Sequence, residues 1–163
     1  MGFSHIDADG GAVMVDISGK EITKREAAAT GYIRMNAECF NAVGDGAVKK
    51  GDVLSTARIA GIMAAKRASE LIPLCHTLNL TNVKIEFTPR PETREITALC
   101  SARCEGGTGA EMEALTGVTA ALLTVYDMCK AIDRRMEIGG IHLVEKSGGK
   151  SGHFLYDAGE NRA

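Results

Sequence analysis

The sequence of 163 residues contains no tryptophan, and aromatic residues make up only 4% of it. No apolar stretch approaches the ~20 residues that a membrane-spanning helix requires. No apolar run near the N-terminus resembles a signal peptide. These absences predict a cytoplasmic chain whose core is built from Ala, Val, Ile, Leu and Met rather than from aromatic rings.

The five cysteines are an odd number and show no disulfide-framework spacing. Cys100 and Cys104 form the closest pair, but no Cys-x-x-Cys motif occurs and no histidine lies beside the pair. The third cysteine of a Cys-x3-Cys-x2-Cys iron–sulfur motif would stand at the position of Gly107. We therefore interpret the pair as small buried residues on one face of a strand, and expect no metal centre.

The sequence also lacks a long run of charges of one sign. The formal net charge is -2, and lysines, arginines, aspartates and glutamates are mixed along the chain without a basic tract. This pattern favours neither a nucleic-acid platform nor a membrane-surface helix. An apolar content of 45% is enough for the core of one domain, and 19 clustered glycines indicate several tight loops.

The strongest helix signal covers residues 108–134. Thr108 and Glu111 have the spacing of a capping box, which would start the helix at Thr108. Apolar residues recur at the spacing of one helical face at Leu115, Val118, Leu122, Val125, Cys129 and Ile132. A second face also carries little charge, at Met112, Thr116, Ala120 and Leu123. A helix that is apolar on two sides is buried on two sides, so we predict that another subunit covers the second face.

The remaining pattern predicts a strand, a helix, two strands in a hairpin, the helix described above and a last strand. The fold class predicted is α+β and ferredoxin-like, with a four-stranded antiparallel sheet and two long helices on one face. Gly61 in the first long helix indicates a close approach by another element, and residues 18–28 indicate a loop or short turn. The predicted elements are strands over 30–35, 83–87, 96–104 and 136–144, a short helix over 36–42 and a long helix over 53–71. We predict a flexible N-terminal lead-in over residues 1–12, a single catalytic domain over 13–152 and a polar C-terminal tail over 153–163.

Two lysine-bearing loops suggest an anionic ligand. Lys49 and Lys50 precede a helix N-terminus, where backbone N–H groups favour an anion. Lys146 and Lys150 flank two glycines, a composition suited to phosphate oxygens, although the P-loop spacing is missing. Each lysine taken alone is better explained as a solvated loop residue, and only the two loops together favour an anionic ligand. His76, which follows a helix end, is either a structural histidine or a partner for phosphate.

Three acidic residues on the strongest helix invite a chemical interpretation. Asp127 and Lys130, three residues apart, are either a surface ion pair or, if buried, an acid–base couple. Glu113 lies off the apolar stripe and is either solvated or a ligand contact, whereas Glu111 suits a cap. The residues alone therefore allow a catalytic protein or a non-catalytic nucleotide-binding module, both as oligomers with a phosphate-bearing ligand.

Several stretches resemble the cyclic pyranopterin monophosphate synthase family, which is the molybdenum cofactor biosynthesis protein C family. The resemblance extends from Met14 to Gly152 and rests on MVDISGK with TKREA, KKGDVLSTARIAGIMAAKRASELIPLCH, GTGAEMEALTGVTAALLTVYDMCKAI and KSGGKSG. One departure is Thr77, where the family commonly has proline after the Leu-Cys-His motif.

The resemblance implies a phosphorus–oxygen lyase that rearranges a 3′,8-cyclised dihydro-GTP to cyclic pyranopterin monophosphate and releases diphosphate. It implies a radical-SAM GTP cyclase as the upstream partner, and a homohexamer (a trimer of dimers) with active sites between subunits. No cofactor is required by the resemblance, and it leaves open whether Mg²⁺, held by Asp16, Glu111 and Glu113, assists the diphosphate.

The resemblance also assigns residues. It implies that Asp127 and Lys130 are the catalytic pair. The residues that it implies for substrate binding are Leu74, Cys75, His76, Met112, Glu113, Lys50, Lys146, Lys20, Arg25 and Asp16.

Overall fold

The computed structural model describes residues 9–150 and 152–157. The predicted lead-in over residues 1–12 and the tail over residues 153–163 fall partly outside this range, so those two boundaries stay predictions. Among the helices of the described residues, none combines the length and the apolar character needed to cross a bilayer.

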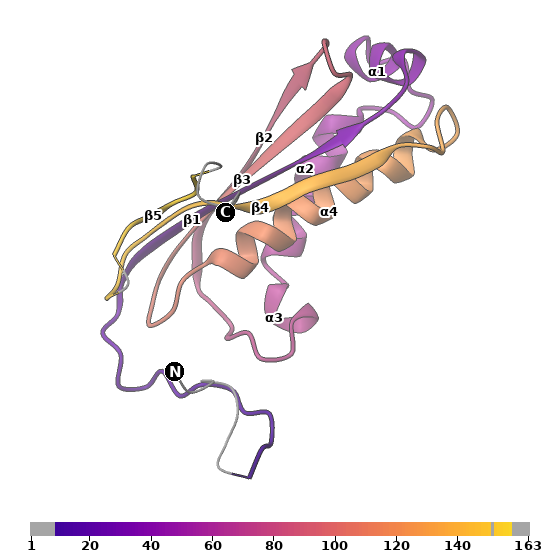
Figure 1. The fold of residues 1–163 in the computed structure, drawn as a ribbon. Coiled ribbons are helices and arrows are strands. Elements are labelled where there is room, and N and C mark those ends of the chain that lie inside the picture. The colour runs from indigo at the N-terminus through magenta and orange to yellow at the C-terminus, as the bar shows by residue number, and fades with distance from the viewer. Residues whose placement is uncertain (1–8, 151, 158–163) are drawn as a thin grey trace.

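The strands form one antiparallel sheet in the order β2-β3-β1-β4-β5 (Figure 1). The central strand β1 pairs with β3 along its whole length, from Thr23 opposite Gly106 to Arg34 opposite Glu95. This order confirms the predicted α+β, ferredoxin-like class. The two-residue β5 at the edge was not predicted. The bounds are β1 Thr23–Arg34, β2 Leu80–Arg90, β3 Glu95–Gly106, β4 Glu137–Ser147 and β5 Phe154–Leu155.

Two long helices, α2 (Val53–Ala65) and α4 (Glu111–Cys129), lie side by side on one face of the sheet, as predicted (Figure 1). The other helices, α1 (Ala37–Gly44) and α3 (Ala68–Leu71), are short. The prediction of one helix over residues 53–71 is wrong in extent. Arg67 leaves the helical conformation, with φ at -116°, and divides the segment into α2 and α3.

The core lies between the helices and the sheet. Val118, Leu122, Val125 and Cys129 of α4 are fully buried, which confirms the predicted stripe. The second face of α4 is not buried within the chain, because Leu123 on that face is 54% exposed. The subunit that we expect to cover it stays a prediction.

The two long helices approach each other closely at two glycines. A Cβ atom on Gly61 would lie 2.7 Å from the backbone oxygen of Gly117, and one on Gly117 would lie 2.6 Å from Sγ of Cys100. Neither position has room for a side chain, which confirms the close approach predicted at Gly61. The contact fixes α4 against both α2 and the sheet, and so fixes the residues at both ends of α4.

The predicted start of α4 and the predicted loop over residues 18–28 are both wrong. The helix begins at Glu111 with Ala110 as its N-cap, and no side chain caps it, because the Glu111 carboxylate is bonded to Lys146 instead. The central strand β1 begins at Thr23, inside the segment interpreted as a loop. The segment was misleading because it is charged and then runs into Ala27, Ala28 and Ala29, and alanine has little intrinsic preference for strands.

Candidate active site

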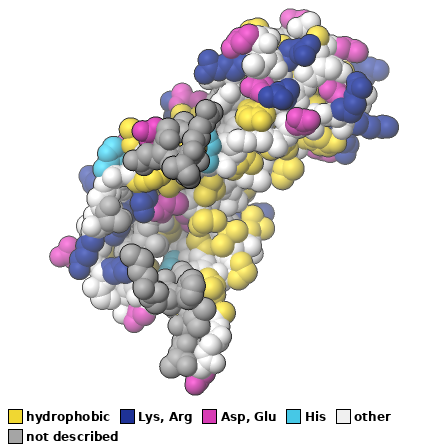
Figure 2. All heavy atoms as spheres, in the orientation of Figure 1, with side chains coloured by type: hydrophobic (Ala, Val, Ile, Leu, Met, Phe, Trp, Pro, Cys, Tyr) yellow, Lys and Arg dark blue, Asp and Glu magenta, His cyan; other side chains and the backbone are white. Residues whose placement is uncertain are grey.

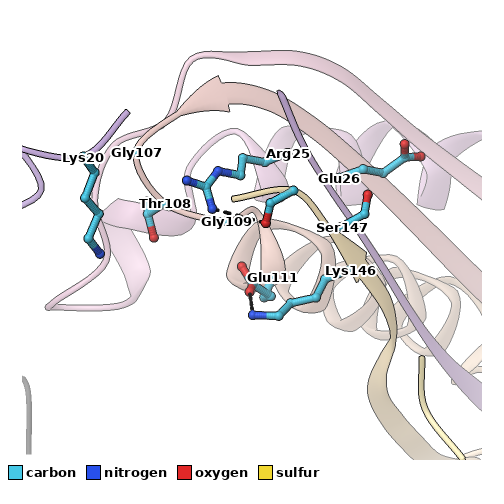
Figure 3. A pocket seen from close by; sticks show the side chains of 10 residues that line it. Lys20, Arg25, Glu26, Gly107, Thr108, Gly109, Glu111, Lys146 and Ser147 are labelled. Atoms are coloured by element: carbon cyan, nitrogen blue, oxygen red, sulfur yellow. Dashed lines mark hydrogen bonds and ion pairs between the residues drawn. The ribbon is translucent and has the colours of Figure 1, made fainter. Parts of the chain in front are cut away.

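A polar cavity of about 160 Å³ lies at the N-terminal end of α4 (Figure 3). Its walls come from the segment before β1, from β1, from the β3–α4 loop, from the first turn of α4 and from the end of β4. Figure 3 shows Arg25 extending toward the loop that carries Thr108 and Gly109 and Lys146 reaching the Glu111 carboxylate, while Glu26 points away. The lining residues are Lys20, Arg25, Glu26, Gly107, Thr108, Gly109, Glu111, Lys146, Ser147 and Gly148.

Arg25 joins the two glycine-rich loops of this cavity. Its Nε donates to the backbone oxygen of Gly106 at 3.3 Å, and its Nη1 donates to that of Gly148 at 3.4 Å. Gly149 has a positive φ of +71°, and a Cβ atom there would overlap the Arg25 guanidinium. The positive φ favours glycine at this position, and the absent side chain leaves room for the guanidinium that links the two loops.

Lys146 forms an ion pair with Glu111, with 2.8 Å between Nζ and Oε1. The two side chains are 30% and 27% exposed, so the pair is partly shielded from water. The cavity therefore presents three cations, Lys20, Arg25 and Lys146, against the carboxylate of Glu111, since that of Glu26 pairs with Arg103. This balance leaves a site that can bind an anion, more strongly if the anion displaces Glu111 from Lys146.

A larger cavity of about 620 Å³ adjoins the first and shares Lys20, Arg25 and Gly107 with it. It adds Gly149 and Lys150, the second lysine of the loop after β4. A volume of this order suits a ligand of nucleotide size. The loop from Lys146 to Lys150, which we interpreted as a phosphate-binding loop, therefore borders cavities that can hold an anion.

The segment Leu74-Cys75-His76 follows α3, and all three residues are partly buried. Nε2 of His76 lies 2.7 Å from the backbone oxygen of Val15, next to Asp16. Hydrogen bonds from Ser18 lower the pKa of the Asp16 carboxyl. The structure therefore brings Asp16 and His76 together, although they are 60 residues apart in the sequence.

Glu113, in the first turn of α4, is buried, with 3% of its surface exposed. Sγ of Cys75 lies 3.8 Å from Oε1 of Glu113 and 3.7 Å from the backbone oxygen of His76, so its single thiol proton is shared between these two acceptors. Oε2 of Glu113 has no hydrogen-bond partner among the described residues. Burial raises the pKa of the Glu113 carboxyl, a shift that its own backbone N–H and the Cys75 thiol partly oppose. Burial, and then Glu113, likewise raise the pKa of the Cys75 thiol. Cys75 and Glu113 are thus in contact, and Met112 beside them is partly buried.

The predicted catalytic pair lies at the opposite end of α4. Nζ of Lys130 is 2.7 Å from Oδ1 of Asp127, and Nζ of Lys50 is 3.1 Å from Oδ2. Hydrogen bonds from Lys130 and then from Lys50 lower the pKa of the Asp127 carboxyl. The burial expected for Lys130 is not found within a single chain, where its side chain is 52% exposed.

The site residues implied by the resemblance therefore form two groups. At 1.5 Å per residue, Glu111 and Asp127 are separated by about 24 Å along the axis of α4. No substrate of nucleotide size reaches both the anion cavity and the acid–amine cluster of the same chain. The N-terminal group holds Asp16, Lys20, Arg25, Leu74, Cys75, His76, Met112, Glu113 and Lys146, and the C-terminal group holds Lys50, Asp127 and Lys130.

Sequence reasoning missed part of the cavity wall. Glu111 was interpreted as a cap rather than as the partner of Lys146, and Thr108, Gly109 and Ser147 were not singled out as lining residues. The signal available was the pair of glycine-rich loops, but no sequence spacing shows that loops 40 residues apart meet across β1. Among the described residues, no group of three histidine, cysteine, aspartate or glutamate side chains could hold a metal ion.

The sequence of this chain is similar to a known protein family and to several of its members. Residues 14–149 match the MoaC family. The chain is 56% identical to the cyclic pyranopterin monophosphate synthase of Clostridium botulinum over 153 residues, covering 94% of this chain and 96% of the relative. It is 53% identical to the protein of that name from Chloroflexus aurantiacus, covering 93% of each chain. It is 54% identical to the one from Roseiflexus sp., covering 94% of this chain and 98% of the relative.

Proposed function

The chain belongs to the MoaC family, and on this premise we propose that it is a cyclic pyranopterin monophosphate synthase of molybdenum cofactor biosynthesis. The proposed reaction rearranges a 3′,8-cyclised dihydro-GTP to cyclic pyranopterin monophosphate and releases diphosphate. The observation that carries the proposal is the cationic, glycine-walled cavity at one end of α4 together with the acid–amine cluster at the other.

The cavity suits the phosphate chain of such a substrate. A triphosphate brings several negative charges, and Lys20, Arg25 and Lys146 converge on one small polar space. Arg25 donates two hydrogen bonds to the loops and so holds the cavity walls in place. Its remaining N–H groups are available to the ligand. In this proposal the same cations stabilise the diphosphate as it leaves.

The cluster at the other end suits proton transfer. Lys50 and Lys130 hold the Asp127 carboxylate from both sides, which keeps it ionised near neutral pH. Opening and reclosing the guanine-derived ring requires protons to move at nitrogen and at carbon. An amine in contact with a carboxylate supplies both a proton donor and a proton acceptor.

The two groups form one site if two chains pack with their α4 helices running in opposite directions. In that arrangement the Asp127 end of one helix lies beside the Glu111 end of its partner. The exposed apolar residues Leu123 of α4 and Ile59 and Met63 of α2, which are 54%, 64% and 40% exposed, offer a surface for such packing. Figure 2 shows hydrophobic side chains gathered over the region where Figure 1 places α3 and the adjoining helices. This packing would put the active site between subunits, in keeping with the homohexamer that the resemblance implies.

The proposal has consequences for partners and location. The substrate must be produced by an enzyme that cyclises GTP, and a radical-SAM GTP cyclase is the proposed upstream partner. The protein is proposed to act in the cytoplasm, in keeping with five cysteines that are all free thiols.

Incubation of the purified protein with the cyclised GTP intermediate tests the proposal. We expect stoichiometric release of diphosphate together with a pterin product identified by mass spectrometry. The variants Lys130→Ala and Asp127→Ala should retain the oligomeric state and form no product. Binding of the intermediate without release of diphosphate would instead support the alternative function, a non-catalytic nucleotide-binding module.

A further inference from the structure

Asp133 lies in the turn that follows α4 and is buried, with 5% of its surface exposed. Its Oδ2 accepts a hydrogen bond from the backbone N–H of Asn36 at 2.8 Å, and its Oδ1 accepts one from that of Arg135 at 2.9 Å. These bonds lower the pKa of the Asp133 carboxyl, so the group is ionised at neutral pH. A buried carboxylate is costly unless it is hydrogen-bonded, so the two N–H groups hold it in one place.

Asp133 ties the end of α4 to the start of α1. Asn36, which donates to it, is the N-cap of α1, and the side-chain oxygen of Asn36 accepts the backbone N–H of Cys39 at 2.8 Å. Cys39 of α1 and Cys129 of α4 are both fully buried, and their thiols are in hydrogen-bond contact. The first turn of α1 is therefore held against the last turn of α4 at two places.

The other end of α1 leads to Lys50. Between them Val48 is buried in the core, and its backbone oxygen accepts the N–H of Gly51 at 3.0 Å. Lys50 thus projects from a tight turn, and its Nζ contacts both the backbone oxygen and Oδ2 of Asp127. The position of Lys50 relative to α4 is set by how α1 is held.

We propose that Asp133 is a positioning residue for the reaction, because it holds α1 against the end of α4 and so places Nζ of Lys50 on the Asp127 carboxylate. This inference rests on the proposed function. The contacts close a ring, from Asp133 through α1 to Lys50, from Lys50 to Asp127, and along the chain back to Asp133. Nζ of Lys50 lies 3.1 Å from Oδ2, and a shift of α1 by about 1 Å would end that hydrogen bond.

The tie can be broken from either side with little change in volume. Both partners of Asp133 are donors, so the amide NH2 of Asp133→Asn would face an N–H group and one bond would be lost. Asn36→Pro removes the donor instead, and the φ of -70° at this position suits proline. Asn36→Ala is its matched control, because it loses the same cap but keeps the N–H.

NMR of the labelled Asp127 carboxyl carbon tests the positioning in the oligomer without substrate. Lys50 helps to lower the pKa of Asp127, so Asp133→Asn should raise that pKa toward its ordinary value, as Lys50→Ala does. Removal of the Asp133 charge by itself would act in the opposite direction, so a rise reports the loss of Lys50. Asn36→Pro should raise the pKa more than Asn36→Ala. A pKa of Asp127 that stays at the wild-type value in both Asp133→Asn and Asn36→Pro overturns the inference.

Turnover provides the second test. In Asp133→Asn, kcat should fall about 10-fold or more with KM nearly unchanged, because the anion cavity at the other end of α4 is untouched. In the Lys50→Ala background the same substitution should lower kcat less than about twofold, since the residue through which Asp133 acts is already gone. Equal losses in the two backgrounds would mean that Asp133 serves the fold as a whole, and would overturn the inference.

Two controls separate this inference from general instability and from the proposed function. Ile85→Val lowers stability at a buried position of β2 beside Gly61, and should leave both kcat and the pKa of Asp127 at wild-type values. If wild type releases no diphosphate, the proposed function fails, and the NMR shift alone decides whether Asp133 positions Lys50. If wild type is active and Asp133→Asn turns over within about twofold of it, only this inference fails.

Discussion

Lys50 contacts Asp127 twice, at 2.8 Å from Nζ to the backbone oxygen and at 3.1 Å from Nζ to Oδ2. One amine therefore holds both the last turn of α4 and the carboxylate that this turn carries. Lys130 takes the other carboxylate oxygen at 2.7 Å. Asp127 is thus fixed by two cations from two segments of the chain, although all three side chains are about half exposed.

The first prediction concerns the pKa of Asp127. Lys130 is the largest cause of its lowered pKa and Lys50 the next. Lys130→Ala should therefore raise the pKa of Asp127 toward its ordinary value by more than Lys50→Ala does, and the double variant should raise it furthest. The measurement is NMR of the labelled Asp127 carboxyl carbon as a function of pH, with Lys84→Ala as a control for loss of an exposed, ion-paired lysine. Equal shifts for Lys50→Ala and Lys84→Ala would contradict the bridging role of Lys50.

The second prediction separates activity from stability at the same cluster. Lys130→Ala and Lys50→Ala should each lower kcat at least 100-fold if these amines take part in proton transfer. The free energy of unfolding should change by less than about 1 kcal/mol, because exposed ion pairs contribute little. Enzyme assays and denaturant unfolding at one protein concentration supply the two values. A large loss of stability with retained turnover would assign the lysines to the fold instead.

The fold was largely predictable because its signals are local. The apolar stripe from Val118 to Cys129 and the alternation in β3 each report burial on one face, and their order leaves few topologies. The close approach at Gly61 was predictable for a similar reason, since glycine inside a helix weakens it unless another element requires the space.

The candidate site was predictable only in part, because its geometry is non-local. The Cys75–Glu113 contact and the Arg25 bridge between Gly106 and Gly148 join segments whose sequence separation carries no periodic signal. The capping-box pattern of Thr108 and Glu111 was misleading, since a lysine from β4 competes for the same carboxylate. Exposure of Lys130 could not be predicted either, because composition of a helix face does not reveal whether the same chain or another one covers it.

The third prediction tests the subunit interface. Ala120→Glu or Leu123→Glu would bury a carboxylate in the expected contact between α4 helices, so either should dissociate the oligomer. Sedimentation velocity measures the state, and circular dichroism checks that the chain stays folded. Thr88→Glu, at an exposed position on β2, is the control for added charge. An intact oligomer in both α4 variants would show that this face of α4 does not form the subunit interface.

The fourth prediction follows from the raised pKa of Glu113. Above the ordinary pKa of glutamate the unfolded chain releases this proton while the folded chain retains it, so stability falls as pH rises toward the folded-state pKa. Glu113→Gln removes this dependence. From about pH 4 to about pH 8, the unfolding free energy of the variant should therefore decline less than that of wild type. Denaturant unfolding at fixed protein concentration measures both, and Glu38→Gln should follow wild type. Parallel curves for wild type and Glu113→Gln would show that Glu113 titrates normally.

The last prediction concerns the contact that positions α4. Gly61→Ala would place a methyl group 2.7 Å from the backbone oxygen of Gly117, which cannot rotate away. The helices must separate, and overpacking of this kind costs about 1–3 kcal/mol. Gly44→Ala at the end of α1, where a Cβ atom meets nothing within 4 Å, should leave stability unchanged or raise it by about 0.5 kcal/mol. Because α4 carries a part of the site at each end, Gly61→Ala should also lower kcat, whereas Gly44→Ala should not. Wild-type stability and turnover in Gly61→Ala would mean that the helices can separate there without cost.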